Sequence, residues 1–209
     1  DTGTFNIALG DTLQFAGGAH NLSAGSAIAG AGNLALSGGT INFAGSVGVS
    51  GATTLSAGTA NFNAATTLPS LVFSGGILGG SGALTLNNSL TWSAGNMSGT
   101  GSTTLAATGT GSITNTGQVQ ISQRALNNAG TLTWSGSGDI GLDTSASLNN
   151  QAGATFTISN NQSVLNNGGA APNFSNTGTL TKTSSGTSNV NAAFNNASGG
   201  VVNVNAGTL

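Results

Sequence analysis

Apolar and small polar residues alternate over many short stretches of this chain. Leu132-Thr133-Trp134 and Val202-Asn203-Val204 are two examples, and a period of two residues is typical of a strand with one buried face. Glycine, asparagine and Ser-Gly pairs recur every few residues and favour turns between such strands. No stretch sustains the 3.6-residue period of an amphipathic helix. The pattern therefore predicts an all-β protein with essentially no helix.

The alternating stretches repeat at a regular interval in the N-terminal half. A Ser-Gly/Ala-Gly turn begins at Ser37, Ser56, Ser74 and Ser93, and so recurs at steps of about 19 residues. Leucines that end short strands keep the same step, from Leu36 to Leu55 and from Leu86 to Leu105. Two independent features with one period indicate a structural repeat.

The C-terminal half has longer repeats with a different corner. An apolar residue followed by two asparagines recurs with the pairs Asn127-Asn128, Asn149-Asn150, Asn166-Asn167 and Asn195-Asn196. Strands are expected over 130–134, 153–157, 178–182 and 200–204, and their first glycines are separated by about 22–25 residues. Short strands with such periods predict a parallel β-helix, or β-solenoid, in which each coil bonds to the next.

We therefore expect one continuous β-solenoid over residues 1–209, with coils of about 19 residues over 1–110 and of about 22 residues over 111–209. About nine to eleven coils of 18–25 residues, at about 4.8 Å each, would give a rod of about 45–50 Å. An antiparallel sandwich also has turns every 8–12 residues, but it does not require a fixed period.

In-register stacking predicts that like residues lie on like residues in successive coils. We expect Phe43 over Phe62, Phe73 over Trp92, and then an interior column of Trp134, Phe156, Phe174 and Phe194. The paired asparagines are expected to form ladders of amide hydrogen bonds at one corner.

Composition and charge narrow the picture. The chain has 36 glycines, no cysteine, 3% charged residues and a net charge of −2. Such a chain, with 37% hydrophobic residues, is expected to avoid aggregation only through ordered strand pairing. The absence of a basic cluster predicts no nucleic-acid partner, and the short apolar runs predict no insertion into a membrane. The start at Asp1, without a recognisable signal peptide, suggests a processed product or a segment of a longer protein.

The repeats resemble those of a known class of bacterial proteins. The runs over 126–134 and 194–209 resemble repeats of filamentous-haemagglutinin-like exoproteins and of autotransporter passenger domains. This resemblance implies a right-handed parallel β-helix, secretion across a bacterial outer membrane, and adhesion or display at the cell surface. The implied partners are host or neighbouring-cell surfaces, glycans, or further copies of the chain stacked end to end or laterally.

Few side chains could carry chemistry. Asp139 and Asp143 are the only close acidic pair; acidic pairs or clusters serve as acid/base pairs or calcium sites in some solenoid enzymes. We expect Asp143 instead to form a lateral ion pair with Arg124, which precedes it by close to one coil. His20 is the only histidine, so one chain cannot assemble a histidine metal site or a catalytic triad. Lys182 is expected to point outward. We predict no catalytic residue, no metal and no cofactor.

Three functional hypotheses follow. The leading one is a structural or adhesive stalk or filament segment of a secreted bacterial surface protein, without catalysis. The first alternative is a carbohydrate-active β-helix protein that binds or cleaves a polysaccharide. The second is an ice-binding solenoid, suggested by Thr53-Thr54, Thr66-Thr67 and Thr103-Thr104, although no Thr-x-Thr row on every coil is apparent.

Overall fold

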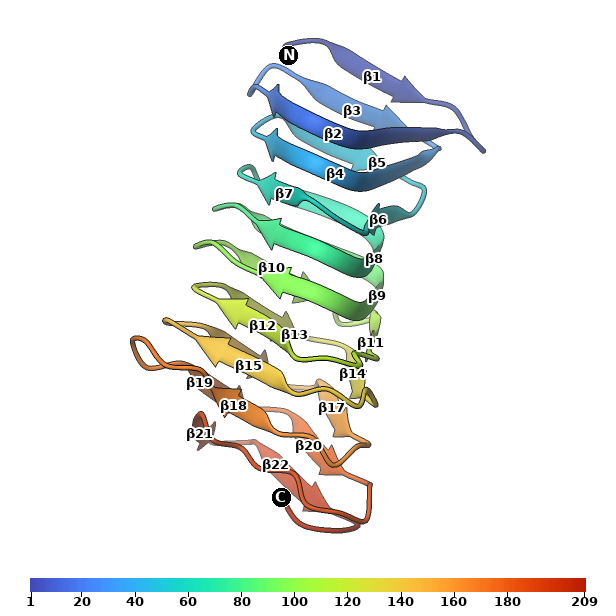
Figure 1. Ribbon diagram of the computed structural model, residues 1–209. Coiled ribbons are helices and arrows are strands. Elements are labelled where there is room, and N and C mark those ends of the chain that lie inside the picture. The colour runs from blue at the N-terminus through green and yellow to red at the C-terminus, as the bar shows by residue number, and fades with distance from the viewer.

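The protein is a rod of stacked coils, described over residues 1–209 by a computed structural model. It contains strands and no helix, and every strand ladder is parallel. The chain winds through about ten coils, and its two termini lie at opposite ends of the rod (Figure 1). The predicted all-β parallel solenoid is therefore confirmed. No helix in the structure has the length and hydrophobicity to cross a membrane.

The coils contribute strand segments to three faces, and all but the last two coils have a strand segment on each face. The first face contains β1 (Thr4–Ile7), β3 (Ala27–Gly30), β5 (Ser46–Val49), the first parts of β8 (Thr66–Gly79) and β9 (Ala83–Met97), β10 (Ser102–Leu105), β13 (Ala125–Asn128), β16 (Ser147–Asn150), β19 (Asn173–Asn176) and β21 (Ala193–Asn196). The second face contains the first parts of β2 (Thr12–Leu22) and β4 (Asn33–Phe43), β6 (Thr53–Leu55), the middle of β8 and β9, β11 (Thr110–Ile113), β14 (Thr131–Trp134), β17 (Thr155–Ile158), β20 (Thr179–Lys182) and β22 (Val201–Val204). The third face contains the last parts of β2, β4, β8 and β9, together with β7 (Thr59–Phe62), β12 (Val119–Ser122), β15 (Ile140–Asp143) and β18 (Val164–Asn166).

The register sets the length of each coil. On the third face Asn42 pairs with Asn61, and these partners are 19 residues apart. On the first face Asn150 pairs with Asn176, and these partners are 26 residues apart. The paired segment contains four residues in both cases, so the additional residues lie in the corners.

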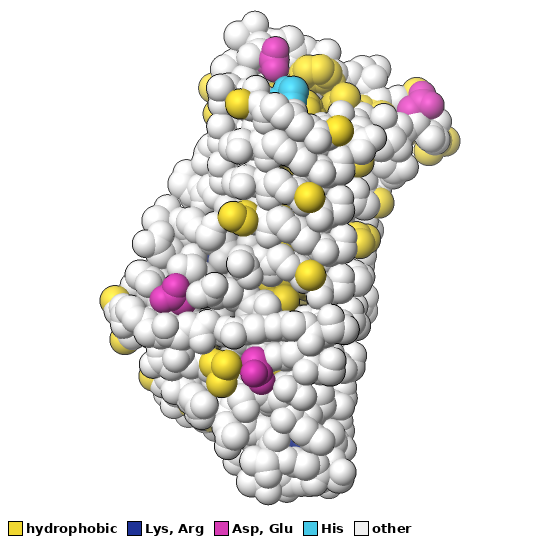
Figure 2. All heavy atoms as spheres, in the orientation of Figure 1, with side chains coloured by type: hydrophobic (Ala, Val, Ile, Leu, Met, Phe, Trp, Pro, Cys, Tyr) yellow, Lys and Arg dark blue, Asp and Glu magenta, His cyan; other side chains and the backbone are white.

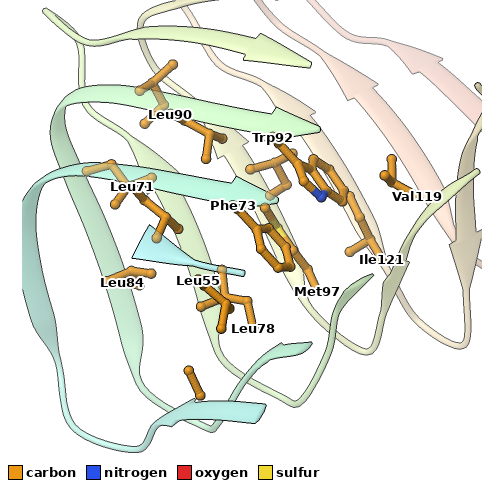
Figure 3. Packing of buried hydrophobic residues seen from close by; sticks show 14 of the residues in the cluster. Leu55, Leu71, Phe73, Leu78, Leu84, Leu90, Trp92, Met97, Val119 and Ile121 are labelled. Atoms are coloured by element: carbon orange, nitrogen blue, oxygen red, sulfur yellow. The ribbon is translucent and has the colours of Figure 1, made fainter. Parts of the chain in front are cut away.

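The core is a continuous apolar column inside the rod. A single cluster of 39 buried hydrophobic residues extends from Ile7 to Ala192. Figure 3 shows a section of it, where Leu71 and Phe73 of β8 lie beside Leu90 and Trp92 of β9. Because alternate residues of every strand point inward, each coil adds a layer of side chains to the same core.

Two pairs of aromatic rings stack as the register places them. Phe43 and Phe62 are partners between β4 and β7, with ring centroids 4.8 Å apart and an interplanar angle of 16°. Phe73 and Trp92 are partners between β8 and β9, with centroids 5.9 Å apart and an angle of 7°. The buried indole N–H of Trp92 donates to the carbonyl of Gly95 at 3.2 Å.

The expected single column of Trp134, Phe156, Phe174 and Phe194 is wrong. Trp134 pairs with Ile158 and Phe156 pairs with Leu132 on the second face, whereas Phe174 and Phe194 are partners on the first face. The spacing between successive members of this set is close to the length of one coil. Because the corner lengths vary, the four residues nevertheless belong to two different faces of the solenoid. Phe156 still contacts Phe174 across the interior, with centroids 5.7 Å apart.

Asparagines form two ladders at the predicted corner, with one change of membership. The inward ladder runs from Asn128 to Asn150 and Asn176, each side-chain amide donating to the next carbonyl oxygen at 2.8 Å, and continues to Asn196 at 2.7 Å. The outward pair is Asn127 and Asn149, joined at 2.8 Å; Asn195 lies outward at the same register, two coils after Asn149.

The prediction that Asn166-Asn167 belongs to this corner is wrong. Asn166 ends β18 on the third face and pairs with Leu142, while Asn176 of β19 occupies the ladder position. The signal that distinguishes them is local. Asn128 and Asn176 stand two residues before the glycine that opens the next strand, whereas Asn166 and Asn167 precede a long corner.

Candidate functional site

The side chains able to carry charge do not gather at one place. Figure 2 shows acidic groups that are separate from one another on the visible face, and isolated hydrophobic spots between them. No group of three or more His, Asp or Glu side chains is close enough to hold a metal ion. The polar features of the rod are instead two buried basic residues, the asparagine ladders and a row of outward hydroxyl groups.

Arg124 lies inside the rod rather than on its surface. Its side chain is fully buried at the corner between the third and first faces. The guanidinium Nε donates to the Thr103 hydroxyl at 2.9 Å, and the two Nη atoms donate to the carbonyls of Gly80, Ser98 and Ser102 at 3.1, 3.2 and 2.9 Å. One side chain therefore connects three successive coils.

The predicted ion pair between Arg124 and Asp143 is wrong. The side-chain hydrogen bonds of Arg124 all go to the preceding coils, whereas Asp143 lies in the following coil. The Asp143 carboxylate instead accepts from the Thr144 hydroxyl at 2.9 Å and from the Gln120 amide at 3.2 Å. Burial lowers the pKa of Arg124 to about 10, because removal from water disfavours the charged form.

Lys182 is also buried, contrary to the expected outward orientation. It ends β20 at the inward position that Ile158 occupies in the preceding coil. Its ammonium group donates to the carbonyl of Ser184 at 2.7 Å, to the Ser184 hydroxyl, and to the Asn161 side chain at 3.4 Å. The strand alternation therefore sets the direction of the side chain, and its long stem carries the charge to polar groups at the corner. Burial lowers the pKa of this amine.

Asp139 and Asp143 are both half-buried and serve local structure. The Asp139 carboxylate accepts from the backbone N–H of Ser163 at 2.8 Å, which joins two successive coils. Asp143 has the partners described above. His20 lies in the first coils, where its ring contacts Phe15 with centroids 4.8 Å apart and its Nε2 is 2.8 Å from the carbonyl oxygen of Gly17.

Outward hydroxyl groups form two parallel rows on the second face, over five successive coils. We call this surface the threonine face; its members are Ser89 and Thr91 of β9, Thr110 and Ser112 of β11, Thr131 and Thr133 of β14, Thr155 and Thr157 of β17, and Thr179 and Thr181 of β20. All of these side chains are exposed or half-buried. None of their hydroxyl groups has a hydrogen-bond partner within the protein, whereas the outward asparagines of the first face bond to one another.

A Thr-x-Thr row on every coil is absent, as expected, but three successive coils carry the motif on β14, β17 and β20, and β9 and β11 carry a serine in place of one threonine. The adjacent pairs considered in the sequence each place one threonine inside the rod, since Thr53, Thr66 and Thr103 are buried. The informative signal was the Thr-x-Thr motif within the expected strands over 130–134, 153–157 and 178–182. The register brings these motifs directly above one another.

Sequence reasoning also missed several structural polar residues. A third ladder connects Asn21, Asn42 and Asn61 on the outside of the third face, with amide bonds of 2.7 and 2.8 Å. Asn115 is fully buried; it accepts from the indole N–H of Trp134 at 3.1 Å and donates to the carbonyl of Asp139 at 3.0 Å. In the sequence, this third ladder is indicated by an outward asparagine that recurs at intervals of one short coil.

The last coil exposes part of the apolar interior. Val190, Phe194, Val202, Val204 and Leu209 line a shallow hollow at the C-terminal end. Phe194 is 40% exposed, although its partner Phe174 is fully buried one coil earlier. The hollow has no polar or charged lining residue.

Comparison with known proteins gives no relative: no protein family, curated protein or solved structure matches this chain. The fold itself defines the chain as a parallel β-solenoid repeat protein.

Proposed function

We propose that this chain is a structural or adhesive rod segment of a secreted bacterial surface protein. The observation that carries the proposal is the unbroken stack of parallel coils around one continuous core. In such a stack each coil contacts mainly its neighbours, so length and stiffness increase with the number of coils. The extracellular location and the surface partners rest on the resemblance of the repeats to those of bacterial exoproteins.

The polar ladders support a mechanical role. Arg124 connects three coils, and the inward asparagines connect four. Because a buried amide left without partners costs about 1–3 kcal/mol, each ladder resists the separation or sliding of coils. We propose that the neutral outer faces provide shallow, repeated contact surfaces, and that the chain performs no catalysis. The engagement of the Asp139 and Asp143 carboxylates in local hydrogen bonds supports this view.

The experiment compares binding with cleavage on the purified chain. Beads coated with the protein are tested for retention on bacterial and host cell surfaces and on a glycan array, and pectin- and alginate-like polysaccharides are tested for cleavage. Retention without released product would support the proposal. Release of oligosaccharide product that is lost in Asp143→Asn would overturn it in favour of the carbohydrate-active alternative.

Small-angle X-ray scattering tests the rod itself. About ten coils at about 4.8 Å predict a stiff particle about 45–50 Å long. A flexible chain with no defined cross-section, together with no retention on any surface, would overturn both the structural and the adhesive form of the proposal.

A further inference from the structure

The threonine face is a regular outer surface of the protein. Its strands β11, β14, β17 and β20 follow one another down the rod (Figure 1), and their ladders contain no register shift. The ladders between β2 and β4 and between β8 and β9 do contain such shifts. The five coils that carry the paired hydroxyl rows therefore keep one register throughout.

The two rows form a grid with two fixed spacings. Hydroxyl-bearing residues in adjacent coils are about 4.8 Å apart along the rod, and the two residues of one strand are about 6.6 Å apart across it. Five coils make the grid roughly 20 Å long. The spacing along the rod is close to one repeat distance between oxygen atoms on a prism face of hexagonal ice, and the spacing across it is somewhat shorter than the other repeat.

The side chains of the grid are held in place from beneath. The inward residues between the paired threonines, Leu132, Phe156 and Leu180, are fully buried in the core. A threonine in a strand has a restricted χ1 torsion because it is branched at Cβ. Each threonine of the grid therefore presents one methyl and one hydroxyl group at a set point, and little side-chain freedom is lost when the face binds a rigid surface.

The chemistry of the face fits ordered water better than a sugar. The outward positions of the five coils carry only threonine and serine, with no charged group and no aromatic ring. Sugar rings are commonly held by aromatic stacking and by charged or amide side chains, which this face does not present. Methyl groups favour a cage of ordered water, and hydroxyl groups without partners in the protein can join that cage by hydrogen bonding.

We propose that the threonine face binds ice, by ordering water on the grid of hydroxyl and methyl groups from Ser89 to Thr181. Binding depends on the match of the whole grid, so one bulky charged side chain within it disrupts it. Thr157 is chosen because it lies on the middle one of the three successive Thr-x-Thr strands, with Thr133 and Thr181 beside it in the neighbouring coils. This inference concerns one face only and does not depend on the proposed surface role of the rod.

The experiment measures thermal hysteresis, inhibition of ice recrystallisation and partition of the protein into a growing ice hemisphere. The variants are Thr157→Lys and the control Thr85→Lys. Thr85 is a half-buried outward threonine in the middle of a strand segment, but it lies on the first face. Circular dichroism and thermal unfolding of both variants establish that the fold is retained.

We expect the unchanged protein and Thr85→Lys to inhibit recrystallisation and to enter the ice, and Thr157→Lys to lose most of both activities. The double variant Thr133→Val/Thr157→Val keeps the methyl grid, removes two hydroxyl groups and is expected to retain part of the activity. Absence of all three activities in the unchanged protein would overturn the proposal. Equal loss in both lysine variants, or binding of the face to crystalline cellulose or chitin instead of ice, would also overturn it.

Discussion

Two buried threonines provide a direct test of how polar groups are accommodated inside the rod. Thr53 and Thr103 are both fully buried at inward strand positions. The Thr53 hydroxyl has no hydrogen-bond partner and lies between Leu34 and Leu71 in the neighbouring coils. The Thr103 hydroxyl accepts from Nε of Arg124 at 2.9 Å. We therefore expect Thr→Val to act in opposite directions at the two positions.

The magnitudes follow from the cost of unpaired buried groups. Thr53→Val replaces an unpaired hydroxyl by a methyl group of similar shape and is expected to raise the free energy of unfolding by about 1–3 kcal/mol. Thr103→Val leaves a charged donor without its partner and is expected to lower it by about 1–3 kcal/mol or more. For a chain of this size, about 1 kcal/mol corresponds to about 2–4 °C in the unfolding midpoint.

Differential scanning calorimetry and urea titration of both variants measure these changes. Because coils of a solenoid can unfold separately, amide hydrogen exchange of β6 and β10 provides a local readout. The reasoning is refuted if Thr53→Val destabilises the protein, or if the two variants shift stability in the same direction by similar amounts.

Two further predictions concern the buried ladder and the buried cation. Asn150→Leu removes the partner of Asn128 and of Asn176 and is expected to lower the free energy of unfolding, measured by urea titration, by about 2–5 kcal/mol. The control Asn149→Ala, at the half-exposed neighbour, is expected to lower it by less than about 1 kcal/mol. Equal losses in the two variants would contradict the role of the ladder. Burial lowers the pKa of Arg124 to about 10, so above that pH the unfolded chain binds more protons than the folded chain and the contribution of Arg124 to stability rises with pH. Urea midpoints at pH 9 and pH 11 should show this rise, and Arg124→Met should show a smaller rise, because the pKa of buried Lys182 is also lowered.

The sequence allowed the strands and the solenoid to be predicted because both depend on local patterns. A Gly-Thr-Leu-Thr motif specifies a turn and an alternating strand wherever it occurs, as at Gly130 and Gly178. Stacking of Phe43 on Phe62 followed because the two residues are separated by one coil of regular length. These features need no knowledge of the corners.

The incorrect predictions rest on corner length or on residue type, and not on the alternation of inward and outward residues along each strand. Trp134 and Phe174 were assigned to one column because their spacing resembled whole coils, but the corners between them have different lengths. Lys182 was expected outside because it is charged, although its position after Thr181 is inward in every equivalent strand. Adjacent threonines do not reveal the threonine face, because residues two apart in a strand share a face.

The interior changes its chemistry where the coils become longer. In one inward column of the first face, Leu86 and Leu105 are followed by Asn128 and Asn150, so an aliphatic column becomes an amide ladder at a single step. An aliphatic column tolerates sliding of one coil on another, but an amide ladder does not, since a misplaced asparagine loses its partners in the interior.

Arg124 lies at this same step, immediately before β13. Its bonds to Gly80 and Ser98 reach back into the shorter coils, while its own strand begins the asparagine ladder at Asn128. Because the guanidinium group has a fixed fork of donors, it sets the register of the first longer coil on the last shorter ones. From that coil onward the inward asparagines maintain the register, and the corners are free to vary in length without displacing the strands or the threonine face.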